Sequence, residues 1–348
     1  MDNTQKNNKF LPISEPMITT YTQHAHLLTI IGNYKFTYPW IFSNYIQLYI
    51  NKDYIKHSWS DFYFPFPYEL RPSDTCKWIT SQKIQRDVVF NKWGTFLNLI
   101  IDCINSDTYI HAMIDNYYIP FKENYLIRHF LHDILIVGYD LNKKVVFGYE
   151  FSEQGRYCCK EISFNNITKA FQVYDTENNP DYLNKTIYLY RINEDSDYMF
   201  DIRNIINSIK AYLYAKVPEY WEMYNNENRD EVVFGVDIYG VLKDYSIRNS
   251  QMESSYIDIR PYYLLYDHKK LMAIRIKYLL ENNYLLKINE TILDRFSKLE
   301  EKTRRIIYLL LKYNETKQIG IINRITIFLR EIEIEEKEAL TNLIDLLN

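Results

Sequence analysis

The residues best suited to chemistry are a histidine and a glutamate on the two strands of a predicted β-hairpin. His132 begins a short apolar run that ends at Tyr139, and Glu150 lies near the end of the returning run, Val145 to Phe151. A carboxylate on a neighbouring strand can hold the tautomer and orientation of an imidazole that acts as a general base. An enzyme of this design also needs a nucleophile, often at the N-terminus of a helix whose dipole lowers its pKa. The expected order is early helix, histidine strand, acidic strand.

The first amphipathic helix runs from about Gln23 to Tyr34, begins Gln23-His24-Ala25-His26, and has no cysteine at its start. His24 could line a cleft in the nucleophile's place, or it could belong to a polar first turn. His24 and His26 are two residues apart and project in different directions, which excludes the i,i+4 spacing of a helical metal pair.

None of the four cysteines lies in a CxxC motif, and no clustered histidines complete a zinc site. They are Cys76, Cys103, Cys158 and Cys159. We interpret them as reduced, structural thiols, and we expect no metal and no cofactor. Cys76, in a loop bounded by prolines, is the thiol nearest in sequence to the first helix.

Periodicity predicts a sheet around the hairpin. The strands 132–139 and 145–151 are joined by a turn at Asp140 to Lys143. Further strands are predicted at 108–115, 157–164 and 187–192. A helix capped near Asn165 follows the strand at 157–164, and a turn is expected at 178–181.

Other helices are predicted from apolar spacing and breakers. The first helix should end at Gly32 in the left-handed conformation. Helical patterns also occur at 41–48 and 93–103. The aromatic run Trp59 to Phe64 lies between them, and Pro65 and Pro67 then break the chain.

Beyond about residue 198 the apolar period changes from two to 3.6. Helices are predicted from Asp258, as N-cap, from Asn289 and over 317–347, with Glu301 and Arg305 forming an i,i+4 pair. The second half is therefore expected to be an antiparallel helical domain. His268 is interpreted as a helix-face or interdomain contact, and nothing in this half requires catalysis.

Composition excludes several classes of protein. The formal net charge of −4 gives no overall attraction for nucleic acid or anionic lipid. The N-terminal residues lack the apolar core of a signal peptide, and no stretch approaches the roughly 18 apolar residues of a membrane span. We expect a cytoplasmic protein with no nucleic-acid or membrane partner.

The run from His132 to Asp140, which ends Gly138-Tyr139-Asp140, resembles the histidine strand of bacterial papain-like families. The wider arrangement resembles the butirosin biosynthesis protein H N-terminal family. Asp258-Ile259-Arg260 and the segment 267–272 are similar to the helical tails of that family. The resemblance implies an α+β protein, with a papain-like domain of helices packed on an antiparallel sheet over residues 1–195 and an all-α domain over 196–348.

The resemblance also implies acyl or aminoacyl transfer in peptide natural-product or antibiotic biosynthesis, with a carrier-bound thioester as donor. His132 carries over as general base and Glu150, one methylene longer than the usual Asp, as the residue that orients it. The family's cysteine does not carry over, because Gln23 and His24 occupy its place. The partner would be an acyl or peptidyl carrier protein, or a peptide.

Three roles for His132 remain open. It could be a structural remnant in a catalytically inactive binding or adaptor subunit that grips a peptide or carrier protein. It could be a general base for direct attack of an amine on the thioester, without a covalent enzyme intermediate. It could also pair with a thiol brought in by folding, such as Cys76.

Overall fold

The computed structural model describes residues 7–63, 71–172, 185–216, 231–252, 256–286 and 291–348. The chain divides into two compact units. Unit 1 comprises Met1–Thr37 and Arg71–Asp197, and unit 2 comprises Tyr38–Leu70 and Tyr198–Asn348. The domain boundary expected after residue 195 lies close to Asp197, the last residue of unit 1. Residues 38–70, expected in the first domain, belong to unit 2.

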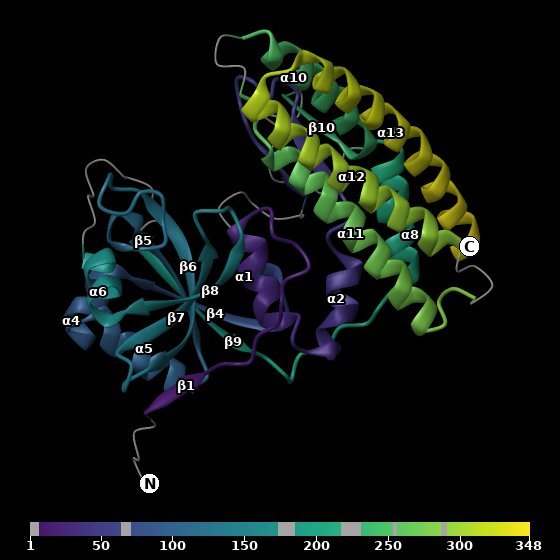
Figure 1. Ribbon diagram of the computed structural model, residues 1–348. Helices are drawn as coiled ribbons and strands as arrows, with labels where there is room; N and C mark the ends of the chain where they lie inside the picture. The colour runs from purple at the N-terminus through teal and green to yellow at the C-terminus, as the bar shows by residue number, and fades with distance from the viewer. Residues whose placement is uncertain (1–6, 64–70, 173–184, 217–230, 253–255, 287–290) are drawn as a thin grey trace. The chain divides into compact units, whose positions relative to one another are not determined.

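Unit 1 is built on an antiparallel sheet (Figure 1) with the strand order β4-β9-β5-β6-β7-β8, and β1 pairs with the end of β6. The strands are β1 (Asn8–Phe10), β4 (Ile79–Gln85), β5 (Tyr109–Asp115), β6 (Leu131–Asp140), β7 (Val145–Phe151), β8 (Tyr157–Ser163) and β9 (Thr186–Ile192). The predicted hairpin and the predicted strands at 108–115, 157–164 and 187–192 are confirmed.

The hairpin turn is fixed by the side chain of Asp140. Its Oδ1 accepts hydrogen bonds from the backbone amides of Asn142 (2.9 Å) and Lys143 (3.0 Å), as a turn aspartate commonly does. Gly138, near the end of β6, admits the backbone of β1, because a Cβ there would lie 2.6 Å from the carbonyl oxygen of Lys9.

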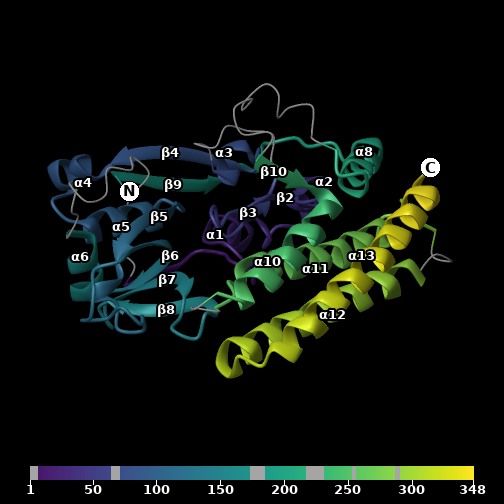
Figure 2. The same cartoon turned by 90° about the horizontal axis from the view of Figure 1, so that it is seen from above.

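Helices lie on both faces of this sheet. They are α1 (Thr22–Ile31), η1 (Lys35–Thr37), α3 (Pro72–Thr75), α4 (Arg86–Trp93), α5 (Phe96–Asn105), η2 (Asn116–Tyr118) and α6 (Phe164–Gln172). Figure 2 shows α5 and α6 on one face and α1 on the other. We call these the α6 face and the α1 face. The α6 face is apolar at its centre, where Ile134 and Ile162 pack against Gly148.

Two predictions about helix ends in unit 1 were wrong. The helix predicted at 93–103 is present as α5, but it begins at Phe96 rather than Trp93, because Gly94 adopts φ +72° and Thr95 caps α5 through its side chain. Gly32 is not left-handed, since its φ is −62°. It is needed for close packing instead, because a Cβ would lie 2.5 Å from the carbonyl oxygen of Leu28.

The predicted cap of the helix after β8 also needs correction. The side chain that accepts the hydrogen bond is Ser163, whose Oγ lies 3.1 Å from the backbone nitrogen of Asn166. Asn165 is already inside α6. A hydroxyl at the last strand residue thus satisfies a free amide of the first helical turn.

Unit 2 is mainly helical but is not all-α. Its helices are α2 (Tyr38–Ser43), α8 (Ile202–Leu213), η4 (Gly235–Asp237), α10 (Ile238–Ser250), α11 (Arg260–Glu281), α12 (Thr291–Thr316) and α13 (Ile319–Leu347). A small antiparallel sheet in the order β10-β2-β3 accompanies them. Its strands are β2 (Leu48–Asn51), β3 (Ser60–Phe62) and β10 (Val232–Phe234). This sheet corrects the expectation of an all-α second domain.

The long helices of unit 2 follow the predicted pattern. α12 packs against both α11 and α13, and Arg305 Nη2 lies 2.5 Å from Glu301 Oε1, as the i,i+4 spacing predicted. Asp258 accepts from the amide of Arg260, but the cap position itself is Ile259.

The helix predicted at 41–48 is shorter than expected, since α2 ends at Ser43. Pro65, Pro67 and the turn predicted at 178–181 lie outside the described residues. Among the helices described, none combines the length and apolar character needed to cross a membrane.

Candidate functional site

The structure brings His132 and Glu150 together on the α6 face. His132 is on β6 and Glu150 on β7, and the two strands pair in antiparallel register. The Nδ1 atom of His132 lies 3.2 Å from Oε1 of Glu150. The side chain of Glu150 is fully buried, whereas 32% of the His132 side chain is exposed. A buried carboxylate therefore orients an imidazole that solvent can reach.

Two further groups hold the buried carboxylate. Lys122 Nζ forms an ion pair with Glu150 Oε1, and Asn116 Nδ2 donates to the same oxygen at 3.3 Å. Burial by itself lowers the pKa of His132, but the hydrogen bond and charge of Glu150 outweigh it, so the pKa is raised above its usual value. The imidazole is therefore protonated over a wider pH range than that of a free histidine.

Gln23 and His24 belong to α1, on the other side of the sheet. Thr22, the first residue of α1, donates a hydrogen bond of 2.7 Å to Asp133 Oδ2. Because successive residues of a strand point to opposite faces, His132 lies on the face away from this contact. Chain order suggested that His132 would meet the start of α1, but the register places Asp133 there. His24 is buried within α1, and Gln23 is half-buried.

The cysteines offer no thiolate to the imidazole on the α6 face. Burial raises the pKa of the Cys76 thiol to about 12 and those of Cys103 and Cys159 to about 11. Cys158 stands opposite Glu150 in the β7–β8 ladder and shares its face. It is two strands away from β6, and neighbouring strands are about 4.8 Å apart. That separation exceeds the reach of a thiol–imidazole hydrogen bond.

A histidine close to β6 provides a contrast. His129 precedes the strand, and its Nδ1 lies 2.5 Å from Asp115 Oδ2. Its ring stacks on that of Tyr117 with centroids 4.4 Å apart, and 60% of its side chain is exposed. It therefore belongs to the loop before β6 and does not join the pair formed by His132 and Glu150.

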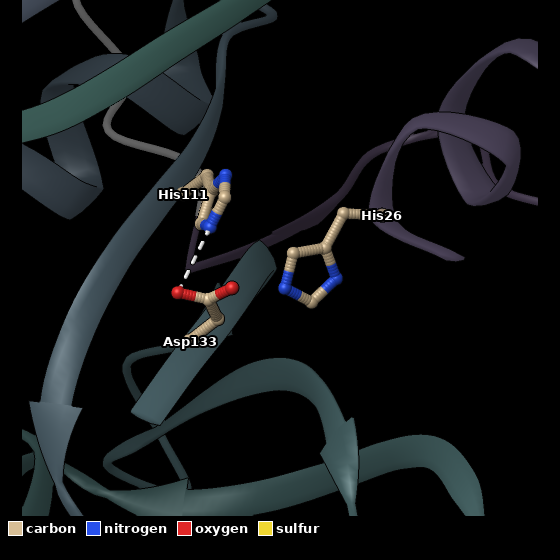
Figure 3. Close-up of side chains that lie close together, drawn as sticks. All are labelled: His26, His111 and Asp133. Atoms are coloured by element: carbon tan, nitrogen blue, oxygen red, sulfur yellow. Dashed lines mark ion pairs between the residues drawn. The ribbon is translucent and has the colours of Figure 1, made fainter. Parts of the chain in front are cut away.

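A second cluster of titratable side chains lies on the α1 face (Figure 3). It consists of His26 from α1, His111 from β5 and Asp133 from β6, and one ligand atom from each lies within 4.8 Å of the others. Nε2 of His111 is 3.5 Å from Oδ1 of Asp133. Figure 3 shows the ring of His26 facing the same carboxylate. We call these three residues the His26 cluster.

Tyrosine hydroxyls contact the Nδ1 atoms of both imidazoles in the His26 cluster. His26 Nδ1 lies 2.7 Å from the hydroxyl of Tyr157, and His111 Nδ1 lies 3.1 Å from that of Tyr190. The two imidazole rings meet edge to face with centroids 4.8 Å apart. The Nε2 atom of His26 is buried and has no hydrogen-bond partner within the described part of the chain.

The charges of the His26 cluster are unevenly distributed. Burial lowers the pKa of both His26 and His111, so the imidazoles are neutral at pH 7. Burial opposes ionisation of Asp133, but the neighbouring Arg71 charge outweighs it, and the pKa of that carboxyl lies well below its usual range. Arg71 Nη1 is 3.6 Å from Asp133 Oδ2 and 3.3 Å from His111 Nε2.

The sequence prediction missed His111 and Asp133 as candidate residues. Local spacing does not connect them with His26, because the three residues come from distant elements. The available signal was strand parity: Asp133 follows His132 directly, so the two side chains must face opposite sides of the sheet. A polar residue at that position of an apolar strand predicts a second polar site across the sheet.

A group of buried polar residues in unit 2 forms a hydrogen-bonded network of Tyr212, His268, Lys269 and Glu336. Lys269 Nζ lies 2.5 Å from Glu336 Oε1 and donates to the hydroxyl of Tyr212 and to Nδ1 of His268, both at 3.0 Å. His268 Nε2 donates to the backbone carbonyl of Ile46 at 2.8 Å. Every N–H of the ammonium is thus used, as packing of a buried charge requires. His268 is an internal contact of unit 2.

A hollow of about 420 Å³ lies over α12 and α13. Its lining is charged, and the charges pair with one another, as Lys302 does with Glu335 and Arg305 with Glu301. Small-molecule sites are usually enclosed and mostly apolar with a few directed polar groups. The hollow does not have this character.

No protein-family model matches the sequence, and comparison with curated proteins finds no significant match. Inference of function therefore depends on the two sites of unit 1.

Proposed function

We propose that unit 1 is a papain-like acyl-transfer domain in which His132, oriented by Glu150, acts as general base for attack of an amine on a carrier-bound thioester. The observation that carries this proposal is the contact of 3.2 Å between a fully buried glutamate and a partly exposed imidazole. A carboxylate at Nδ1 keeps a proton on that nitrogen and leaves Nε2 as the basic atom. This geometry supports the assignment of His132 and Glu150 as the base half of a catalytic triad.

The proposed reaction needs no enzyme thiol. The amine nitrogen attacks the thioester carbonyl carbon while its proton passes to Nε2 of His132. The carbon–sulfur bond then breaks, and the thiolate takes the proton from the imidazolium. The products are an amide and the free carrier thiol. Because a thioester is already activated, positioning and a base are sufficient, and the base contributes about 10²–10⁴-fold.

The setting of the reaction belongs to the same proposal. The donor would be an acyl or peptidyl carrier protein, and the pathway would make a peptide natural product such as an antibiotic. A cytoplasmic location suits such carriers. The net charge of −4 favours neither nucleic acid nor an anionic membrane as a partner.

The test is amide formation by the full chain with acyl-carrier thioesters, or acyl thioesters of N-acetylcysteamine, and simple primary amines. His132→Ala should lower the rate by about 10²–10⁴-fold. His129→Ala is the matched control, since His129 pairs with Asp115 rather than Glu150, and it should leave the rate unchanged. Iodoacetamide should not inactivate the protein. Amide formation that survives His132→Ala would refute the assignment.

A catalytically inactive binding subunit is the second candidate function. It is favoured by the lack of a thiolate beside His132: Gln23 and His24 lie on α1, on the other face of the sheet, and burial keeps the Cys76 thiol protonated. This function predicts tight binding of a carrier protein or peptide by calorimetry with no amide product. It also predicts that binding is insensitive to His132→Ala.

A further inference from the structure

The His26 cluster has the composition of a transition-metal site. Two imidazoles and one carboxylate are a recurrent set of three protein ligands for zinc and for non-haem iron, with further positions left for water or substrate. His26, His111 and Asp133 come from three different elements of unit 1, and the sheet register holds two of them on one face. His26 and His111 are almost fully buried, with 1% and 2% exposed.

The two histidines are already oriented as metal ligands are. In metal sites the ring nitrogen that does not bind the ion usually bonds to another group, which fixes the tautomer. Here the Nδ1 atoms of His26 and His111 meet the hydroxyls of Tyr157 and Tyr190. When Nδ1 donates to the hydroxyl oxygen, the lone pair of each imidazole lies on Nε2, on the side of the ring that faces Asp133 (Figure 3).

One buried atom supports the assignment of a ligand site. Nε2 of His26 has no hydrogen-bond partner among the described residues. Buried polar atoms are nearly always satisfied, so an isolated one requires an explanation. A water molecule would satisfy it with one hydrogen bond, but it would not account for the convergence of a second imidazole and a carboxylate within 4.8 Å.

The distances between the three ligand atoms would suit a metal ion if the atoms moved slightly closer together. Bonds of about 2.0–2.2 Å to nitrogen and oxygen place neighbouring ligands about 3–3.5 Å apart. The longest separation here is at most 4.8 Å, and the contact between His111 Nε2 and Asp133 Oδ1 is already 3.5 Å. Side-chain rotations that move the ligand atoms by little more than about 1 Å are sufficient.

Arg71 is the competing cation. Its guanidinium lies 3.3 Å from His111 Nε2 and 3.6 Å from Asp133 Oδ2, and it also stands over the ring of Tyr188 at 4.8 Å. A metal ion would have to displace it from both ligands. The flexible stem of an arginine permits this movement, and the aromatic ring of Tyr188 offers a place for the guanidinium.

We propose that His26, His111 and Asp133 bind one divalent transition-metal ion, such as zinc, through two imidazole nitrogens and one carboxylate oxygen. This site lies on the α1 face and is independent of the acyl-transfer proposal, which concerns the α6 face. It revises the expectation from sequence that the chain binds no metal.

The test is binding of Zn²⁺, and of Co²⁺ as a spectroscopic probe, to full-length protein freed of metal by chelation. Calorimetry should give one ion per chain, and Co²⁺ should give visible bands of nitrogen and oxygen ligation. Asp133→Asn, which keeps the side-chain shape, should weaken binding at least about 100-fold. Tyr157→Phe should weaken it about 10–100-fold, as loss of a supporting hydrogen bond does.

Two variants complete the design. His129→Gln changes an exposed histidine that also pairs with an aspartate, and it should leave binding unchanged. Arg71→Met removes the competing cation and should tighten binding. Thermal melting without metal shows whether each variant is folded, and zinc should raise the melting temperature of the wild type but not of Asp133→Asn. Absence of stoichiometric binding, or binding of equal strength in Asp133→Asn, would overturn the proposal.

Discussion

The buried ion pair of unit 2 gives a prediction whose size can be worked out from its contacts. Lys269 and Glu336 are both fully buried and 2.5 Å apart. Burial lowers the pKa of Lys269, and the charge of Glu336 opposes that shift. Glu336→Leu would leave an ammonium without its counter-charge. Breaking a buried pair by removing one partner costs about 3–5 kcal/mol of the free energy of unfolding.

Removal of the lysine instead should lower the free energy of unfolding by a similar amount. Lys269→Met leaves the Glu336 carboxylate buried, although Tyr239 and Tyr212 still donate to its Oε2 at 2.7 and 3.3 Å. The double variant Lys269→Met, Glu336→Leu removes both charges together. Replacing a buried pair by apolar groups is often neutral or stabilising. Here the two tyrosine hydroxyls lose their acceptor, at about 1–3 kcal/mol each.

A double-mutant cycle measured by urea denaturation checks this account. The single changes sum to about 6–10 kcal/mol, and the double variant should lose no more than about 6 kcal/mol. At the middle of the first range, about 8 kcal/mol, the coupling between Lys269 and Glu336 is therefore at least about 2 kcal/mol. Effects that add to within about 0.5 kcal/mol would refute the account, since they would show that the two groups do not interact.

Two further predictions concern unit 1. Because the pKa of His132 is raised, protonated His132 stabilises the fold fully below the ordinary pKa of 6.5, and this stabilisation is lost as pH rises through the raised value. Amide formation should increase over the same pH range. In Glu150→Gln, the NMR titration of His132 and the rise in activity should both move to lower pH, and an unmoved titration would contradict the role of Glu150. Gly32→Ala should destabilise the protein by about 1–3 kcal/mol in thermal melting, because its Cβ would lie 2.5 Å from the carbonyl oxygen of Leu28 and 2.7 Å from Ser14 Oγ; a stable variant would show that the close packing at the end of α1 is not required.

Local pattern was sufficient for the central strands of unit 1. Two short apolar runs, together with the turn at Asp140, predicted the hairpin that carries His132 and Glu150. The shared face of these two residues depends on an irregularity between Ile136 and Gly138, which shifts the register of β6 on β7 by one residue. The turn alone would pair Glu150 with Leu135 and place His132 on the opposite face, so the strands could be predicted from the sequence but this contact could not.

Contacts between distant segments could not be predicted in this way. The segment 41–48 has a helical pattern, yet Leu48 begins a strand because β2 pairs with β10, where Ile50 stands opposite Val233. The His26 cluster likewise depends on pairing between distant segments. His111 and Asp133 are close neighbours on one face because the register pairs Met113 with Asp133, and no spacing within one element reveals that register.

The division of the chain also has a consequence for its synthesis. Residues 38–70 leave the ribosome long before residue 198, where the rest of unit 2 begins. The interval is about 130 residues, or roughly 6–26 s at about 5–20 residues per second. During that time Phe42, Tyr45 and Ile46, which are buried in the finished protein, lack their partners. A nascent chain stalled before residue 198 should therefore be a good substrate for chaperones that bind exposed apolar segments.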